Sequence, residues 1–457
     1  MKKTVVINVV GLTKRLIGEH TPFISSFLER GKASYIKPML PAVTCAVQST
    51  YVTGKWPSEH GIVGNGWYFK EECEVKFWRQ SNKLVQQPKV WDDLKEQYPD
   101  FTCANHFWWY NMYSNVDYSI TPRPNYLADG RKIPDIYSHP AALRDQMQKE
   151  LGTFPLFEFW GPKTTINSSN WIANAALLTD KEHNPDLTLI YLPHLDYNLQ
   201  RYGIDFKVIS KDLSEIDAVV RKLVAYYEEQ DSRVILLSEY GITNVNRPVH
   251  LNRLLRKNGF ISIREERGLE LLDAGASAAF AVADHQVAHV YCKDKTKIEA
   301  VASLIKKEKG VENVLYGEDL KAAHLQHERC GDIVVVADKE SWFTYYFWLE
   351  DSKAPDYARM VDIHKKPGYD PVEMMTDPKD KLVMAKVVGK LLKKKLGFRT
   401  VMDIIPLDAN LIKGSHGRLT EYEDDHPILI SNFGEGINSQ SIQAVDVRAI
   451  IENHLVN

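Results

Sequence analysis

The most informative stretch of the chain is residues 41–65, which read PAVTCAVQSTYVTGKWPSEHGIVGN. Thr44 stands at the start of an expected helix, so its hydroxyl would lie beside unpaired N–H groups and the positive end of the helix dipole. A hydroxyl in that position can bind an anion and, once activated, act as a nucleophile. Asn65 follows 21 residues later and could donate its amide to a developing oxyanion. The simpler alternative is that Thr44 only caps the helix, which threonine does well.

Outside this stretch, short apolar segments alternate with helical patterns. Apolar, β-branched runs predict central strands at residues 4–10, 34–40, 187–192, 233–237 and 332–337. Helical patterns occupy residues 22–30, 212–229 and 251–257. This alternation predicts an α/β fold, a mainly parallel sheet with helices on both faces.

Two aromatic-rich regions interrupt this alternation. They predict an insertion at 66–162 and a second one at 341–395, with a core made of 1–65, 163–340 and 396–457. The aromatic runs 107–110 and 342–348 could shape a substrate pocket, since loops collect at the strand ends of open α/β sheets. Equally, they could be ordinary packing between the insertions and the core.

Composition excludes several classes of protein. The chain has 457 residues, 44% of them hydrophobic, and a net charge of −3, so it can bury a large core and shows no overall basic footprint for nucleic acid or a membrane surface. It has no run of 18 apolar residues and no secretory signal pattern at its start. Five scattered cysteines argue against a disulfide framework. We therefore expect a cytoplasmic protein with a small-molecule partner; the oligomeric state is open.

The segment 41–65 resembles the nucleophile region of the nucleotide pyrophosphatase/phosphodiesterase family, part of the alkaline phosphatase superfamily. Both have a proline-flanked Thr opening a helix, the pattern TG-x-x-P-x-x-HG, and an Asn 21 residues after the Thr. The likeness extends to residues 5–12, 189–203, 236–241 and 414–417. It implies an alkaline-phosphatase-like core and a hydrolase with Thr44 as nucleophile and Asn65 as oxyanion donor.

The resemblance also implies a centre of two zinc ions with seven ligands. Thr44, Asp196 and His416 match ligand positions, and Glu239 replaces an aspartate. Three ligand positions depart from the family pattern, and they carry Val10, Gln200 and Tyr240.

The remaining donors suggest at least one metal ion. Asp196, Glu239 and His416 would leave an open position, as in catalytic sites with three protein ligands, and two carboxylates would admit Mn or Mg as well as the expected Zn. A second ion could be rebuilt by His285 and His289, whose i, i+4 spacing would place both on one face of a helix or a strand.

Other residues are additional candidates for metal or substrate binding. They are Gln200, Tyr240, His250 and His364, although a lone histidine is more often structural. Tyr240 could be a metal ligand, a neutral hydrogen-bonding phenol or a core residue, and the neutral hydrogen-bonding role is favoured because its ordinary pKa is near 10.

Three functions are considered, and the first is the one we predict. The first is a metal-dependent hydrolase of a phosphoester, phosphodiester or phosphonate in a small metabolite. The second is a catalytically degenerate relative that binds a phosphorylated or anionic ligand. The third is an enzyme of altered chemistry, a transferase or isomerase, because fold does not fix reaction.

Overall fold

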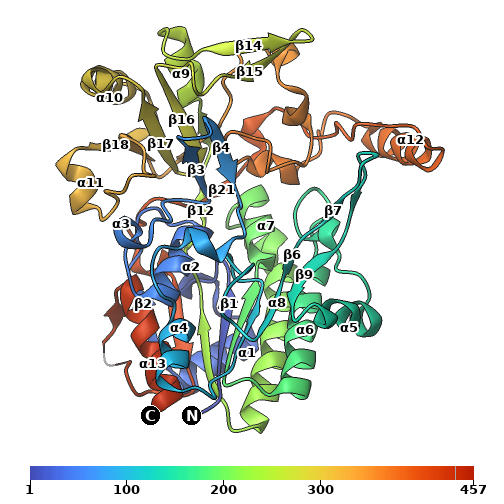
Figure 1. Ribbon diagram of the computed structural model, residues 1–457, viewed down its shortest axis with the longest axis vertical. Helices are drawn as coiled ribbons and strands as arrows, with labels where there is room; N and C mark the ends of the chain where they lie inside the picture. Colours follow the sequence, from blue (N-terminus) through green and yellow to red (C-terminus); the bar gives the residue numbers. More distant parts are fainter. Residues whose placement is uncertain (438) are drawn as a thin grey trace.

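The protein, described by a computed structural model over residues 1–437 and 439–457, has two tiers (Figure 1). The lower tier contains both termini and is built on a nine-stranded sheet, while a four-stranded sheet lies in the upper tier. The order of the large sheet is β23 (Ser441–Ile442), β2 (Lys32–Ile36), β22 (Ile428–Ser431), β11 (Arg233–Leu237), β1 (Thr4–Val9), β10 (Leu187–Leu192), β5 (Cys103–His106), β6 (Tyr118–Pro122), β9 (Ile136–His139). From β11 to β6 the strands run parallel, which confirms the predicted α/β fold.

Helices cover both faces of this sheet. Every residue of β1 and β10 is buried, as expected for parallel strands covered on two sides. One face carries α1 (Pro22–Arg30), α6 (Asn167–His183), α7 (His194–Tyr202) and α8 (Phe206–Glu229). The other carries α2 (Thr44–Thr53), α4 (Val90–Gln97) and α13 (Val447–Val456). The sequence-based predictions for α1, β1, β10 and β11 are thus confirmed to within a residue.

The upper tier is an antiparallel sheet of order β16 (Ala279–Asp284), β17 (Val287–Cys292), β19 (Ile333–Ala337), β18 (Val311–Tyr316). Three helices belong to it, α9 (Leu251–Lys257), α10 (Ile298–Ile305) and α11 (Glu318–Ala322). The prediction of a central strand at 332–337 was therefore wrong about its sheet. An apolar run shows that a strand is buried, but not which sheet it joins.

The structure divides the chain differently from the expected insertions. Residues 103–139, expected outside the core, contribute β5, β6 and β9 to the large sheet. These strands have only four or five residues, and prolines flank β6 and β9, so their periodicity is hidden in the sequence.

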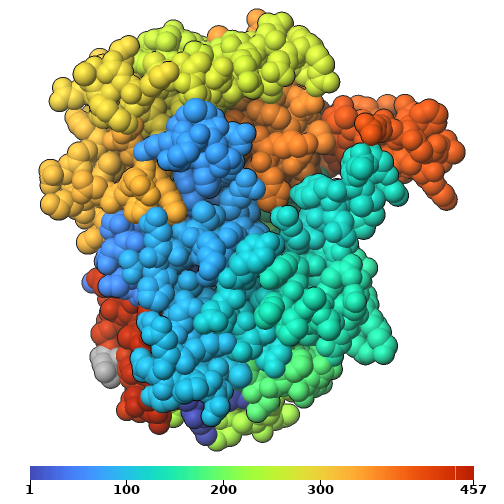
Figure 2. Space-filling view, in the orientation of Figure 1, coloured from blue at the N-terminus to red at the C-terminus, as the bar shows by residue number. Residues whose placement is uncertain are grey.

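The segment 341–395 begins with β20 (Ser341–Phe343) and ends in α12 (Val383–Lys395). Trp342, Tyr345 and Trp348 are fully buried in a hydrophobic cluster of their own, so this aromatic run is packing and not pocket wall. Helix α12 projects from the body of the molecule (Figures 1 and 2).

The remaining elements are short or peripheral. They are α3 (Pro57–His60), α5 (Ala142–Leu151), β3 (Gly66–Phe69), β4 (Glu74–Phe77), β7 (Asn125–Tyr126), β8 (Lys132–Ile133), β12 (Thr243–Asn244), β13 (Arg247–Val249), β14 (Ile263–Glu266), β15 (Leu269–Leu272) and β21 (Gly414–Ser415). None of the described helices combines the length and apolar character that crossing a bilayer requires.

Candidate active site

Thr44 is the first residue of α2 and is buried at the floor of a large cavity of about 1490 Å³. The N-cap position is taken by the extended Val43, so Thr44 is the first helical residue and does not occupy the cap. Its Oγ1 lies 3.0 Å from the hydroxyl of Tyr240. The side chain therefore faces other functional groups, and capping does not account for it.

Asn65 holds the first turn of α2 in place. Its Oδ1 accepts a hydrogen bond from the backbone N–H of Cys45 at 2.9 Å. Its own backbone N–H and its Nδ2 donate to the carboxylate of Asp284 at 2.8 and 3.1 Å. The amide expected to face a substrate oxygen is thus committed to Asp284, a residue that the sequence analysis did not identify.

Asp196 lies on α7 and is bonded to two of the residues that depart from the family pattern. Gln200 Nε2 donates to its Oδ2 at 2.8 Å, and the Tyr240 hydroxyl donates to its Oδ1 at 3.4 Å. Burial raises the pKa of Asp196 to about 7, although both hydrogen bonds oppose the shift. Burial, with the nearby carboxylates of Asp196 and Glu239, also raises the pKa of Tyr240 far above its usual range. Tyr240 is therefore a neutral phenol here.

Glu239 follows β11 and is almost fully buried. Asn8 Nδ2 and Gln48 Nε2 both donate to its Oε1 at 2.5 Å, while Oε2 has no partner among the described residues. Burial raises the pKa of Glu239 to about 8, and the hydrogen bonds from Gln48 and Asn8 oppose this shift. Asn8 could have been noticed in the sequence as the polar residue that interrupts an apolar strand.

Two histidines present free ring nitrogens to the same region. His416 Nδ1 bonds the carbonyl of Ala42 at 2.7 Å, and its Nε2 has no hydrogen-bond partner among the described residues and lies 3.9 Å from Asp196 Oδ1. His285 Nδ1 bonds Asp284 Oδ1 at 2.9 Å, and its Nε2 is also without a partner there. Burial lowers the pKa of both rings well below the usual range, so both are neutral. An anchored Nδ1 with a free Nε2 is the arrangement typical of metal-binding histidines.

Aromatic stacking joins the two tiers at this point. The rings of Tyr240 and His416 are parallel, with their centroids 3.6 Å apart. The ring centroid of His285 lies 3.8 Å from that of His416 and 4.0 Å from that of Tyr369. His285 belongs to the upper tier and the others meet it from separate segments.

The prediction that His285 and His289 share one face was wrong. Residues 285 and 286 form the two-residue turn between β16 and β17, and His285 has a φ of +58°. His289 lies on β17, where Nε2 bonds the Val63 carbonyl at 2.8 Å and Nδ1 accepts from Gly331 N at 3.2 Å. Both its nitrogens are therefore engaged, and only His285 reaches the site.

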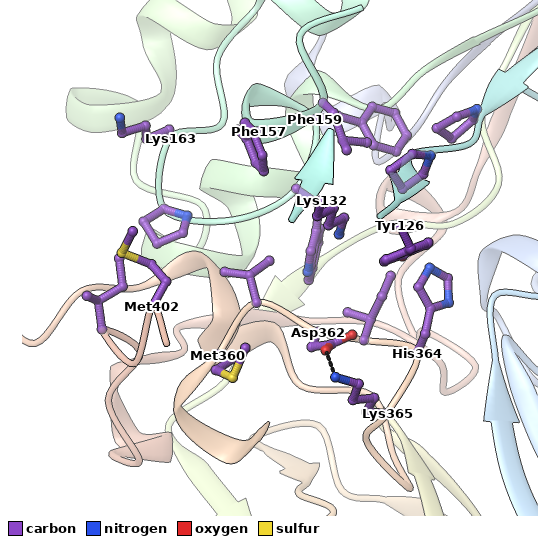
Figure 3. Close-up of a pocket in the computed structure, with 18 of the residues that line it drawn as sticks. Tyr126, Lys132, Phe157, Phe159, Lys163, Met360, Asp362, His364, Lys365 and Met402 are labelled. Carbon is purple, nitrogen blue, oxygen red and sulfur yellow. Dashed lines mark ion pairs between the residues drawn. The ribbon is translucent and has the colours of Figure 1, made fainter. Parts of the chain in front are cut away.

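Three further positions lie apart from the free nitrogens. His250 bonds Thr344 Oγ1 at 2.7 Å at the start of α9, and burial lowers its pKa to about 4. His364 lies at the outer part of the cavity near Tyr126 (Figure 3). Val10 is fully buried and offers no donor.

Within the described residues, the group whose donor atoms all lie within 4.8 Å of one another is His194, Asp212 and Glu215. Asp196, Glu239 and His416 are thus not preassembled to that spacing. Asn198 donates to both oxygens of Asp212 at 2.9 Å, so this carboxylate is already satisfied. The cluster joins α7 to α8 and thereby fixes the helix that carries Asp196.

The cavity extends from Thr44 to the projecting helix α12. Trp78, Trp109 and Trp160 line it, so the run 107–110 contributes one aromatic wall residue. Farther out, Lys132 lies among Tyr126 and Phe159 (Figure 3). The cavity thus combines aromatic walls with cationic side chains.

Comparison with known proteins gives a consistent result. Residues 4–370 match the family model described as type I phosphodiesterase/nucleotide pyrophosphatase. An uncharacterized pyrophosphatase/phosphodiesterase from Schizosaccharomyces pombe is 25% identical over 246 residues, 51% of this chain and 44% of the relative. The chain thus spans about half the length of the curated relatives it matches.

Solved structures share the fold. Murine ectonucleotide pyrophosphatase/phosphodiesterase 5, an inactive form in complex with AMP, gives a TM-score of 0.57 at 15% identity, covering 100% of this chain and 95% of that one. Phosphonoacetate hydrolase from Sinorhizobium meliloti, in complex with phosphonoformate, gives 0.61 at 13% identity, covering 100% and 96%. The family match over residues 4–370 shows that the chain belongs to the type I phosphodiesterase/nucleotide pyrophosphatase family.

Proposed function

We propose that the protein is a metal-dependent hydrolase that cleaves a phosphoester, phosphodiester or phosphonate bond in a small metabolite, with Thr44 as nucleophile. The observation that carries the proposal is the Thr44 hydroxyl, which belongs to the first residue of α2, lies 3.0 Å from the Tyr240 hydroxyl and lines the large cavity. The family match and the small phosphorus-containing ligands of the structural relatives support the same reaction class.

The reaction would use groups that the fold holds ready. Thr44 Oγ1 would release its proton to solvent and form a bond to phosphorus while the bond to the leaving group breaks, and the leaving group would take up a proton from solvent. Water would then cleave the phosphothreonine and restore the hydroxyl. Tyr240 would orient the nucleophile, and the N-terminus of α2 would favour the anionic phosphoryl group. Asn65 would act through α2 by holding the Cys45 N–H in place.

The donors left free in the site fit a divalent metal. They are Nε2 of His416, Nε2 of His285 and Oε2 of Glu239. The carboxylate of Asp196, which already accepts from Gln200 and Tyr240, could join them, since its Oδ1 lies 3.9 Å from His416 Nε2. Zn is the first expectation, with Mn or Mg admitted by the two carboxylates, and one or two ions could be held. Such an ion, when bound, supplies Lewis-acid stabilisation of phosphoryl charge and lowers the pKa of a nearby hydroxyl.

Thr44→Ala and Thr44→Ser test the proposal against a panel of a phosphomonoester, a phosphodiester and phosphonoacetate. We expect the wild type to hydrolyse at least one of them, Thr44→Ala to lose about a thousandfold or more in kcat, and Thr44→Ser to retain part of the rate. Acid quenching followed by mass spectrometry should find phosphate on the peptide containing Thr44. Metal content by plasma mass spectrometry serves as the control for an intact site. Unchanged turnover in Thr44→Ala would exclude Thr44 as the nucleophile.

A catalytically degenerate binding protein is the second candidate. Val10, Gln200 and Tyr240 favour it, because each replaces a family ligand by a residue that binds zinc weakly or not at all. Titration calorimetry with AMP and with phosphonoformate distinguishes the two, since binding without turnover of any panel member would support this alternative. A transferase or isomerase would be indicated by a product other than that of hydrolysis.

A further inference from the structure

Residues 377–403, here called the α12 arm, expose an unusual amount of apolar surface. In α12 itself only Val387 is buried. The large apolar residues exposed along the arm are Leu382, Met384, Val388, Leu391, Leu392, Leu396, Phe398 and Val401. Leu382, Leu396 and Phe398 are each at least 65% exposed. An apolar patch of this extent on a protein surface marks a site of contact with something else.

The length of α12 also indicates that the helix needs a partner to be stable. A helix of 13 residues is marginal in water, and most helices in proteins are stabilised by packing of one face. One side of α12 faces the cavity, which is lined by Val383, Val387 and Leu391. Val388 and Leu392 do not line it, so closure of the arm over the cavity would leave them uncovered.

The charge of the arm is the opposite of the chain's. Residues 377–403 include eight basic and three acidic residues, a net charge of +5, whereas the whole chain carries −3. Lys386 and Lys390 pair with Asp380 and Asp403. The consecutive lysines 393–395 make no ion pair within the described residues. The near-neutral whole-chain balance, which predicted no membrane contact, therefore conceals a local basic cluster.

We propose that the α12 arm docks on the surface of an anionic lipid bilayer. A helix with Leu, Val and Met on one side and lysines beside them lies in the membrane interface, apolar face down and ammonium groups at the lipid phosphates. A second copy of the chain fits less well. A symmetric pair would bring the same patch against itself, and α12 contains five lysines and no acidic residue. The charge of the arm thus complements anionic lipid and repels another arm.

Docking would have a consequence for the cavity. Met384, Lys394 and Phe398 belong to the arm and also line the cavity. The docked arm would therefore place the mouth of the cavity at the membrane surface. This inference concerns the arm and stands whether or not Thr44 is catalytic.

Vesicle flotation with the full chain tests the proposal. Vesicles of phosphatidylcholine containing about one third phosphatidylglycerol should carry the protein, vesicles of phosphatidylcholine alone should not, and high salt should weaken binding. Val388→Glu/Leu392→Glu should lower binding at least tenfold, and Lys381→Glu/Lys393→Glu should do the same. None of these four side chains lines the cavity, so hydrolysis of a soluble substrate, if present, should not change.

The matched control is Val208→Glu/Leu419→Glu, which changes two apolar residues that are 43% and 46% exposed outside the arm. It should bind anionic vesicles like the wild type, and circular dichroism should be the same for all variants. Absence of binding to anionic vesicles, or equal binding by Val388→Glu/Leu392→Glu and wild type, would overturn the proposal. So would light scattering that shows a dimer dissociated by Val388→Glu/Leu392→Glu, because the arm would then cover a second copy.

Discussion

Replacing Glu239 by glutamine should stabilise the metal-depleted protein, and the gain should grow with pH. The carboxyl group is buried, with Oε1 accepting from Asn8 and Gln48 at 2.5 Å and Oε2 unpartnered among the described residues. Glutamine has the same shape and can keep an oxygen at the position that Asn8 and Gln48 address. It removes only the charge that burial disfavours.

The sign and the size follow from the pKa. Burial raises the pKa of Glu239 from its ordinary 4.5 to about 8, so between these values the folded protein holds a proton that the unfolded chain releases. The wild type therefore loses stability as pH rises from about 4.5 and stops losing it above about 8. At about 1.4 kcal/mol per pH unit, roughly 3 kcal/mol of this loss falls between pH 5.5 and 8.5. Glu239→Gln avoids it, which for a chain of this length raises the relative Tm by about 3 °C.

Scanning calorimetry of chelator-treated protein at these two pH values measures the effect. The matched control is Glu373→Gln, since Glu373 is equally buried but lies 2.8 Å from the buried ammonium of Lys366. Burial raises the pKa of Glu373 to about 7, opposed by the Lys366 ammonium, so Glu373 is ionised and paired at pH 8.5. Its replacement leaves a buried cation short of a partner and should destabilise the protein at pH 8.5, where Glu239→Gln should stabilise it. Addition of Zn should then raise the Tm of the wild type more than that of Glu239→Gln. A Glu239→Gln variant that is destabilised equally at both pH values would refute the reasoning.

Three other outcomes are expected. Tyr240→Phe removes the hydroxyl that lies 3.0 Å from Thr44 Oγ1 but keeps the ring stacked on His416. We therefore expect kcat/KM to fall about tenfold or more with little change in Tm. An unchanged rate would mean that the hydroxyl does not orient the nucleophile. His416→Ala should lower the amount of metal bound per chain, as measured by plasma mass spectrometry. His289→Ala should leave that amount unchanged, because both ring nitrogens of His289 already bond backbone groups. Equal metal loss in both variants would contradict this assignment. Asn65→Ala leaves buried groups unpaired and should cost about 2–3 kcal/mol in denaturant unfolding, and an effect below about 0.5 kcal/mol would show that α2 holds its first turn without it.

The elements that could be predicted from the sequence are those whose signal is local. Helix α1 begins at Pro22 and is followed by Gly31, and β1 and β10 are continuous apolar runs, so their positions are readable without knowledge of the fold. Strands β5, β6 and β9 were missed, since pairing with distant segments decides them more than their own composition does. For the same reason β19 was placed in the wrong sheet.

In the candidate site, too, the residues that could be predicted are those with a local signal in the sequence. Thr44 and Asp196 could be located because each lies in a compact motif, and the structure joins them through Tyr240, which bonds both. Asp284 and Gln48 were missed because each acts through another residue, and no spacing in the sequence indicates such contacts. The turn that separates His285 from His289 depends on the pairing of two strands, so the i, i+4 rule did not apply.

The altered ligand positions favour our proposal of a reorganised site over that of a decayed one. Gln200 and Tyr240 both bond Asp196, so two of the three departures from the family pattern still act within the cluster. Buried polar atoms without partners each cost about 1–3 kcal/mol, and a structure with no use for them would be more stable with apolar residues there. Yet Glu239, His285 and His416 each keep an unpartnered atom in this region among the described residues. Under the proposed function, a divalent cation and an anionic substrate would complete the bonding of these three atoms.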